Sequence, residues 1–220
     1  MLYSYCIPVD DGAAPNPFWG ICTLAICKPV IRRTAVAGDW IVGTGSMKYG
    51  FQNKLIYAMR IDSVMPFSEY DRYCKIKLPE KIPDWKSKDL RRRVGDCIYD
   101  FSSGKPVLRK SVHEGEEIIK RDFRGANALL STHYCYFGSQ PIQIKESLLP
   151  IVKQGQGHKS KANDPYLGEF VEWIEEFLKN NNEHQILPYG FNVWEDEECS
   201  LSCSTRHIEE DDADERFGDC

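Results

Sequence analysis

The chain has 220 residues, of which 42% are hydrophobic and 28% charged, and its formal net charge is −5. This length suffices for one domain with a sizeable core, and no stretch approaches the roughly 18 consecutive apolar residues of a membrane-spanning helix. The N-terminal residues MLYSYCIPVDD lack the basic region and apolar core of a signal peptide. We therefore expect a cytoplasmic protein with no membrane partner.

The nine cysteines are odd in number and have no framework spacing, which predicts reduced thiols rather than disulfides. Four of them lie in apolar runs: Cys6, Cys22, Cys27 and Cys135. In such runs cysteine behaves as a small hydrophobe. Cys199, Cys203 and His207 are spaced as metal ligands could be, but they lie in an acidic segment that favours a mobile tail. We expect no metal and no other cofactor.

The charge is distributed unevenly along the chain. Residues 195–220 contain eleven acidic and two basic residues, so residues 1–194 carry a formal net charge of +4. A basic body with an acidic tail is typical of a nucleic-acid binder whose tail competes for the basic surface. A solvated terminus without a role, or a site for a protein partner, would have the same composition.

Residues 2–7 are apolar and aromatic and predict the first strand, and residues 21–27 predict the second. The loop between them is stiffened by prolines and carries Asp11, Asn16 and Trp19. Such a loop suits a planar polar ligand, which would stack on the indole and bond to the amide and carboxylate. The same loop could instead plug the end of a barrel.

Residues 38–64 are the segment around which we expect the fold to be organised. Two apolar runs, residues 40–42 and 55–61, flank a glycine-rich polar loop and predict a hairpin or a barrel edge. Glycine leaves the backbone amides of that loop open to a ligand. The loop residues predicted to line a pocket are Thr44, Gly45 and Ser46.

The segments APNPFWG, CTLAICKP, GDWIVGTGS and LIYAMRI, together with the Arg32–Arg33 pair, resemble the second family of nucleotide-modification-associated domains. The resemblance covers roughly residues 1–160. Members are prokaryotic and phage proteins associated with hypermodified DNA bases and genome conflict. The resemblance therefore implies a nucleotide or nucleic-acid base as the ligand, but no particular reaction. The hairpin segment also resembles the small barrels of PUA, ASCH, EVE and YTH domains, which bind RNA or modified bases.

Two basic segments are candidates for contact with phosphate. Residues 75–93 combine a high positive charge with Trp85, as expected for a nucleic-acid backbone and a stacked base. The candidate residues there are Lys86, Arg91, Arg92 and Arg93. Residues 154–161 alternate glycines with polar side chains, so that backbone amides, His158 and Lys159 could surround an anion. Flexible surface loops have similar compositions. The Arg32–Arg33 pair is predicted to lie on a strand with its side chains on opposite faces.

The remaining polar candidates have simple structural explanations. Asp96 and Asp100 could act as paired carboxylates, although a Gly-Asp turn with an aspartate at a strand end is the simpler explanation. His113 and His133 are isolated histidines, which more often lie at the surface or in a satisfied core than in a catalytic site.

Two further segments predict helices. The segment PFSEYDRYC favours a short helix with Ser68 as N-cap and an Asp71–Lys75 pair. Asp164 and Pro165 begin an amphipathic helix that extends to about residue 180.

These observations predict an α+β fold, a small PUA-like mixed β-barrel with flanking helices and an acidic C-terminal tail. Residues 1–162 would form a base-binding domain, residues 163–194 a helix and extended segment packed on it, and residues 195–220 the tail. The predicted function is recognition of a nucleotide or modified nucleobase in DNA modification or phage defence. The alternative is an enzyme that modifies or hydrolyses a nucleotide, with Asp11 and His158 as acid–base residues.

Overall fold

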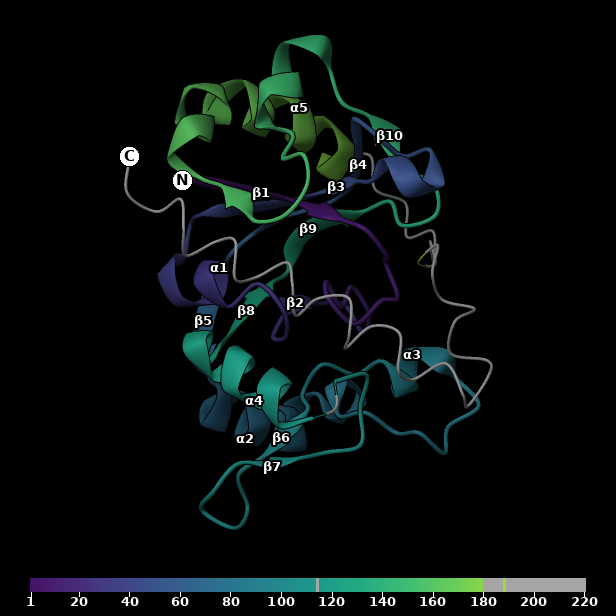
Figure 1. Cartoon of the computed structure of the whole chain (residues 1–220), viewed down its shortest axis with the longest axis vertical. Coiled ribbons are helices and arrows are strands. Elements are labelled where there is room, and N and C mark those ends of the chain that lie inside the picture. Colours follow the sequence, from purple (N-terminus) through teal and green to yellow (C-terminus); the bar gives the residue numbers. More distant parts are fainter. Residues whose placement is uncertain (114, 180–187, 189–220) are drawn as a thin grey trace.

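The structure is a computed structural model that describes residues 1–113, 115–179 and 188. Its strands are β1 (Leu2–Ile7), β2 (Cys22–Leu24), β3 (Trp40–Gly45), β4 (Lys54–Arg60), β5 (Ser63–Pro66), β6 (Tyr99–Asp100), β7 (Val107–Leu108), β8 (Asn127–Ser131), β9 (His133–Tyr136), β10 (Ile142–Gln143) and β11 (His158–Lys159). Its α-helices are α1 (Pro29–Thr34), α2 (Phe67–Lys77), α3 (Leu90–Arg93), α4 (Glu116–Asp122) and α5 (Leu167–Lys179). Short 3₁₀ turns occupy Met47–Tyr49, Pro79–Lys81, Phe123–Gly125, Glu146–Ile151 and Lys161–Tyr166. The predicted α+β class is confirmed (Figure 1).

The described strands form open sheets rather than a barrel. The largest sheet has the order β10-β4-β3-β1-β11, with β9 also paired to β4. A second sheet has the order β2-β8-β5, and β6 pairs with β7. The PUA-like barrel prediction is wrong because the edge strands β10 and β11 pair with β4 and β1 rather than with each other. Closure needs a continuous circle of strand pairing, which these described strands do not make.

The predicted hairpin at the centre of the chain is confirmed. Strands β3 and β4 are antiparallel, and β1 lies parallel to β3 on its other side. The register shifts between Gly43 and Thr44. A Cβ at Gly43 would lie 2.4 Å from both the Ile7 and Tyr57 side chains, so glycine lets the three strands pack at this point.

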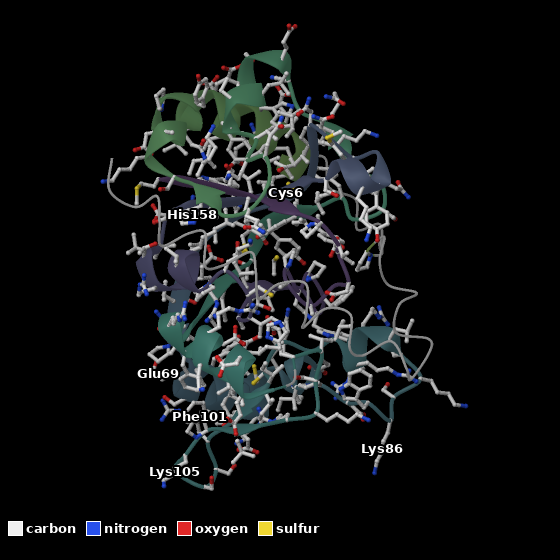
Figure 2. The ribbon with its side chains drawn as sticks, in the orientation of Figure 1. Cys6, Glu69, Lys86, Phe101, Lys105 and His158 are labelled. Carbon is white, nitrogen blue, oxygen red and sulfur yellow. The ribbon has the colours of Figure 1, made fainter. Side chains whose placement is uncertain are left out.

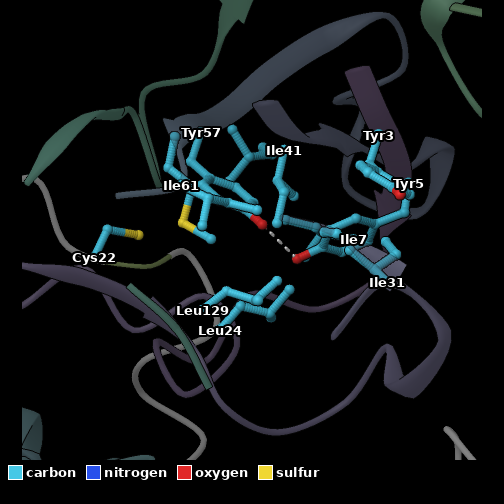
Figure 3. Packing of buried hydrophobic residues seen from close by; sticks show 13 residues of the cluster. Tyr3, Tyr5, Ile7, Cys22, Leu24, Ile31, Ile41, Tyr57, Ile61 and Leu129 are labelled. Atoms are coloured by element: carbon cyan, nitrogen blue, oxygen red, sulfur yellow. Dashed lines mark hydrogen bonds between the residues drawn. The ribbon is translucent and has the colours of Figure 1, made fainter. Parts of the chain in front are cut away.

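Two layers of the core lie on the two faces of the six-stranded sheet. Side chains of β1, β3 and β4 meet Leu24 and Leu129 of the second sheet, and the hydroxyls of Tyr5 and Tyr57 lie 2.9 Å apart within this cluster (Figure 3). Helix α5 covers the opposite face with Phe170, among other apolar residues. The alternation of apolar side chains along β1 and β4 supplies both layers, because successive residues point to opposite faces.

Several local predictions need correction. The Arg32–Arg33 pair lies on helix α1 rather than on a strand, since Pro29 occupies the first helical turn, where proline is preorganised for a helix. Strand β2 is shorter than predicted, because Lys28 precedes α1 with a left-handed backbone. Helix α2 begins at Phe67, so Ser68 lies inside the helix rather than at its N-cap, whereas the predicted Asp71–Lys75 ion pair is present at 2.7 Å.

Helix α5 also begins later than predicted, after the 3₁₀ turn Lys161–Tyr166. Its apolar face packs on the sheet, as expected from the amphipathic pattern. The predicted extended segment at residues 180–194 lies outside the described residues except for Pro188, and the acidic tail lies outside them entirely. Within the described part of the chain, no helix has the length and apolarity that a membrane crossing requires.

Candidate functional site

The larger of two adjoining cavities lies where the parallel strands β1 and β3 end. Its volume is about 330 Å³. The loop after β3 and the loop at residues 152–156 provide most of its wall. The lining residues are Cys6, Pro8, Gly45, Ser46, Met47, Lys48, Gln52, Val152, Lys153, Gln154, Gly155 and Gln156. The carboxyl ends of parallel strands are a common place for ligands in open sheets, so the position itself favours a binding site.

The wall of this large cavity is polar on one part and apolar on another. Amide side chains and two lysines supply donors, acceptors and positive charge, while Pro8, Met47 and Val152 are apolar. The Ser46 Oγ is buried and has no hydrogen-bond partner within the described residues. Buried polar atoms are nearly always satisfied, so this hydroxyl is a candidate ligand contact.

The small cavity has a volume of about 20 Å³, enough for one water-sized group. It shares Cys6 and Pro8 with the large cavity, so the two adjoin at the end of β1 (Figure 2 labels Cys6). Its lining residues are Tyr5, Cys6, Ile7, Pro8, Val9, Asp11, Ala13, Ala14, Ile26, Cys27, Lys28, Val112 and His113. Cysteine, histidine, aspartate and lysine residues therefore line one small space.

Three side chains form a hydrogen-bonded row beside this small cavity. The Cys27 Sγ lies 3.4 Å from Nε2 of His113, and Nδ1 of His113 lies 3.0 Å from Oδ2 of Asp122. Cys27 precedes α1, His113 lies in the loop before α4, and Asp122 is the last residue of α4. All three are buried.

The electrostatics of the row favour an ionised pair. Burial alone would lower the pKa of His113, but the Asp122 carboxylate and the Cys27 thiol outweigh it and raise that pKa to about 10. Burial alone would raise the pKa of Asp122, but His113 and Arg32 hold it below its ordinary value. The Tyr99 hydroxyl donates to Asp122 Oδ2 at 2.9 Å. Asp122 is thus an anion that fixes and charges the imidazole.

The fully buried guanidinium of Arg32 holds both ends of the row. Its Nε donates to the Cys27 carbonyl at 2.6 Å, and its Nη2 donates to Asp122 Oδ1 at 3.1 Å. Its Nη1 donates to the carbonyls of Gly125 and Asn127. Because a guanidinium is a planar fork of donors, this one side chain fixes α1 against the end of α4.

The backbone at the thiol has an unusual conformation. Cys27 and Lys28 have φ values of 58° and 42°, in the left-handed region. For residues other than glycine this region costs roughly 1–2 kcal/mol per residue. Such conformations persist where the surrounding structure over-determines them, and they cluster at functional sites. Here the Arg32 bond to the Cys27 carbonyl is one of the contacts that hold it.

The structure brings some of the predicted site residues to these cavities. Asp11 lines the small cavity, with Oδ1 accepting from the Ala13 amide at 2.9 Å, and Gly45 and Ser46 line the large one. Thr44 is buried, and its hydroxyl donates to the Tyr5 carbonyl at 3.3 Å. The N-terminal turn and the glycine hairpin therefore border adjoining spaces.

Other predicted residues lie elsewhere. His158 is on β11, with its ring 6.0 Å from that of Tyr3, and it lines neither cavity. Asn16 is fully buried: it donates to the Val94 carbonyl and accepts from Lys81 at 2.6 Å. The Trp19 ring packs under the Arg91 guanidinium, 4.9 Å from its centroid. Neither Asn16 nor Trp19 lines these two cavities.

None of the predicted phosphate-binding residues lines either of these two cavities. Arg91 pairs with Asp89 at 2.6 Å, the Arg93 Nε donates to the Ser87 carbonyl, and Arg92 is half-buried. Lys86 is exposed and lies well away from Cys6 in Figure 2. Lys159 on β11 donates to the Pro150 carbonyl.

The two carboxylates considered as a pair have separate partners. Asp96 is buried and accepts from Thr23 and Tyr70, and burial raises its pKa. Asp100 pairs with Lys75 at 2.8 Å, largely in solvent. The described residues contain no cluster of three or more histidine, cysteine and acidic side chains that could hold a metal ion. Cys199, Cys203 and His207 lie outside the described residues.

The row of Cys27, His113 and Asp122 was not predicted from the sequence. Cys27 was interpreted as a small hydrophobe, and His113 as a surface or satisfied core residue. His113 is indeed buried and hydrogen-bonded, but its partners are 86 residues away in the case of Cys27 and nine in the case of Asp122. The only local sign was a cysteine placed two residues before the proline that begins a helix.

Comparison with known proteins adds one finding. A family model described as nucleotide modification associated domain 2 matches residues 1–194. Neither the curated proteins nor the solved structures give a significant match to the chain.

Proposed function

The chain belongs to the nucleotide modification associated domain 2 family, and from this premise we propose that the large cavity binds a nucleotide or a modified nucleobase. The observation that carries the proposal is the cavity itself. Its volume of about 330 Å³ lies in the lower part of the range of small-molecule sites, roughly 300–1,000 Å³. A role in DNA modification or phage defence is the context that the family favours.

The wall of the cavity has the groups that recognition of a base requires. A planar heterocycle needs apolar contact on its faces and paired donors and acceptors along its edge. Pro8, Met47 and Val152 can supply the first. The amides of Gln52, Gln154 and Gln156, with the buried Ser46 hydroxyl, can supply the second.

Two lysines provide a place for phosphate. Lys48 and Lys153 line the same cavity, and the exposed glycine backbone at Gly155 leaves room for an anion beside them. The basic segment around Lys86 lies apart from this cavity, so it would contact a longer nucleic-acid strand rather than the phosphate of the bound nucleotide.

A second candidate function, chemical modification of the bound nucleotide, is favoured by the residues that line the small cavity.

Calorimetric titration of the full chain tests the binding proposal. The ligands are nucleosides, their 5′-monophosphates and short single-stranded DNA, each in unmodified and base-modified forms. We expect saturable binding of at least one of them. Ser46→Ala should weaken it by about two- to tenfold, because one hydrogen bond contributes about 0.5–1.5 kcal/mol.

A pair of lysine variants separates phosphate contact from general charge. Lys48→Ala should weaken binding of the monophosphate more than that of the nucleoside. Lys105→Ala is the matched control, because Lys105 is exposed and lies far from Cys6 (Figure 2). Equal effects of the two variants would show that Lys48 does not contact the phosphate, and no saturable binding of any ligand would overturn the proposed function.

A further inference from the structure

We propose that Cys27 and His113 form the catalytic centre of an acyl-transfer site, with Asp122 as a positioning residue, and that the site hydrolyses an amide or ester carried by a nucleotide. The reaction class follows from the order of the three groups. A thiol hydrogen-bonded to an imidazole, whose other nitrogen is held by a carboxylate, is the arrangement of a cysteine nucleophile with its base and orienting acid. The assignment of the three roles is independent of the large cavity; the nucleotide as substrate class rests on the function proposed above.

Two observations distinguish this row from an ordinary buried network. The first is position, because Cys27 and His113 both line the small cavity, which shares the lining residues Cys6 and Pro8 with the large one. The second is the left-handed backbone of Cys27, with φ at 58°, which a thiol serving only as packing would not need. A functional thiol explains both together.

Hydrogen bonds from neighbouring side chains also hold the row in a fixed geometry. Arg32 bonds to the Cys27 carbonyl and to Asp122, and Tyr99 bonds to the second oxygen of the same carboxylate. The Ser111 hydroxyl donates to the His113 carbonyl at 3.0 Å. Fixed geometry of this kind is what a nucleophile and its base need to stay aligned.

Two parts of the substrate would occupy the two cavities. The small cavity, with a volume of about 20 Å³, has room for a carbonyl-sized group beside the thiol. The body of the nucleotide would occupy the large cavity. Lys28 lines the small cavity, and its ammonium lies 5.1 Å from the centroid of the Tyr5 ring. A buried cation there would stabilise the negative charge that develops on the carbonyl oxygen.

The reaction needs only water as the second reactant. Before the reaction, His113 is protonated on Nε2 and Cys27 is the thiolate. The Cys27 sulfur forms a bond to the carbonyl carbon, the bond from that carbon to the leaving nitrogen or oxygen breaks, and His113 gives its Nε2 proton to the leaving amine or alcohol. Water then attacks the resulting thioester and gives a proton to Nε2 of the neutral His113. The carbon–sulfur bond breaks, the acid is released, and the thiolate beside a protonated His113 is regenerated.

Thiol labelling of the full-length protein tests the proposal without any ligand. Limiting iodoacetamide is applied at pH 6, and labelled cysteines are identified by peptide mass spectrometry. Cys6 is the internal control, because it also lines the small cavity and is more exposed than the buried Cys27. Exposure alone predicts faster labelling of Cys6. A thiol ionised by His113 predicts that Cys27 labels at least about tenfold faster.

Three variants assign the roles. Cys27→Ser should lose the fast label. His113→Gln should move the rise in Cys27 labelling to higher pH, towards the ordinary thiol pKa of about 8.5. Asp122→Asn should move it in the same direction, which a purely structural contact would not do. The comparison of Cys27 with Cys6 labelling in the unaltered protein remains a valid test even if one of these substitutions at a buried residue prevents folding.

An activated ester provides the second measurement. With p-nitrophenyl acetate, we expect release of nitrophenol and an acetyl group on Cys27, both lost in Cys27→Ser. Labelling of Cys6 as fast as Cys27, or acetylation spread over other thiols, would overturn the proposal. Nucleotide binding is measured separately, in the unaltered protein and in Cys27→Ser. If nucleotide binds but Cys27 of the unaltered protein is not reactive, only the catalytic proposal fails. If Cys27 is reactive but no nucleotide binds, only the proposed ligand class fails.

Discussion

Arg32 and Arg33 are neighbours in the sequence with opposite environments. Arg32 is fully buried and donates to carbonyl groups and to the Asp122 carboxylate, whereas Arg33 is exposed and donates to the Arg124 carbonyl at 3.2 Å. A helix places consecutive side chains about 100° apart, so α1 can bury one arginine and leave the next in solvent. The interior charge of Arg32 is needed because the Asp122 carboxylate is buried as well.

The two arginines make a matched test of this arrangement. Arg32→Met should lower the free energy of unfolding by about 3–5 kcal/mol, because it removes one of the two cations beside the buried Asp122 carboxylate and leaves buried carbonyl groups without their donor. Arg33→Met should change it by less than about 0.5 kcal/mol. Urea denaturation of both variants checks the difference. Similar values for the two would mean that the Arg32 bonds contribute little to stability.

At the scale of elements, the contact between α1 and the 3₁₀ turn Phe123–Gly125 decides the geometry of the candidate catalytic row. Cys27 lies two residues before α1, and Asp122 lies directly before the 3₁₀ turn. A Cβ at Gly125 would come within 2.0 Å of the Pro29 carbonyl oxygen. Since that oxygen belongs to the backbone and cannot turn away, the contact requires glycine.

Two glycine substitutions should change the stability of the protein in opposite directions. Gly125→Ala should destabilise the protein by about 1–3 kcal/mol, because the new methyl group forces α1 away from the turn. Gly168→Ala in α5 meets no atom within 4 Å and should stabilise by up to about 1 kcal/mol through lower backbone entropy of the unfolded chain. Thermal unfolding followed by circular dichroism compares them. A neutral Gly125→Ala would show that α1 and the turn can separate without cost.

At the scale of the whole molecule, α5, the six-stranded sheet and the β2-β8-β5 sheet follow one another in layers (Figure 1). The cavities open at the ends of β1 and β3 in the middle layer. Charge is a second property of the whole chain. Residues 1–194 carry a net charge of +4, and the full chain carries −5.

This charge difference predicts the effect of the acidic tail on nucleic-acid binding. A chain of residues 1–194 should bind single-stranded DNA more tightly than the full chain at low salt. The difference should shrink as salt rises, because exposed charges are screened within about 10 Å at 0.1 M. Fluorescence anisotropy at several salt concentrations measures both proteins. Equal affinities at low salt would exclude competition between the tail and the DNA.

The sequence alone determined the features that depend on local pattern. The apolar and aromatic composition of residues 2–7 and the β-branched, nearly alternating residues 55–61 were enough to predict β1 and β4. The glycine-rich segment between β3 and β4 predicted their hairpin. The family resemblance rested on the same N-terminal motifs and was confirmed by the match over residues 1–194. The Asp71–Lys75 pair was predictable because residues four apart meet on a helix.

Only the tertiary structure decided the sheet topology and the catalytic row. Whether strands close into a barrel depends on which edge strands pair, and the spacing of apolar residues carries no information on that. Cys27 and His113 are 86 residues apart and meet because the buried charge of Arg32 joins α1 to the end of α4. The sequence lists each of these side chains, but their proposed function depends on the contact between Cys27 and His113, which no local pattern encodes.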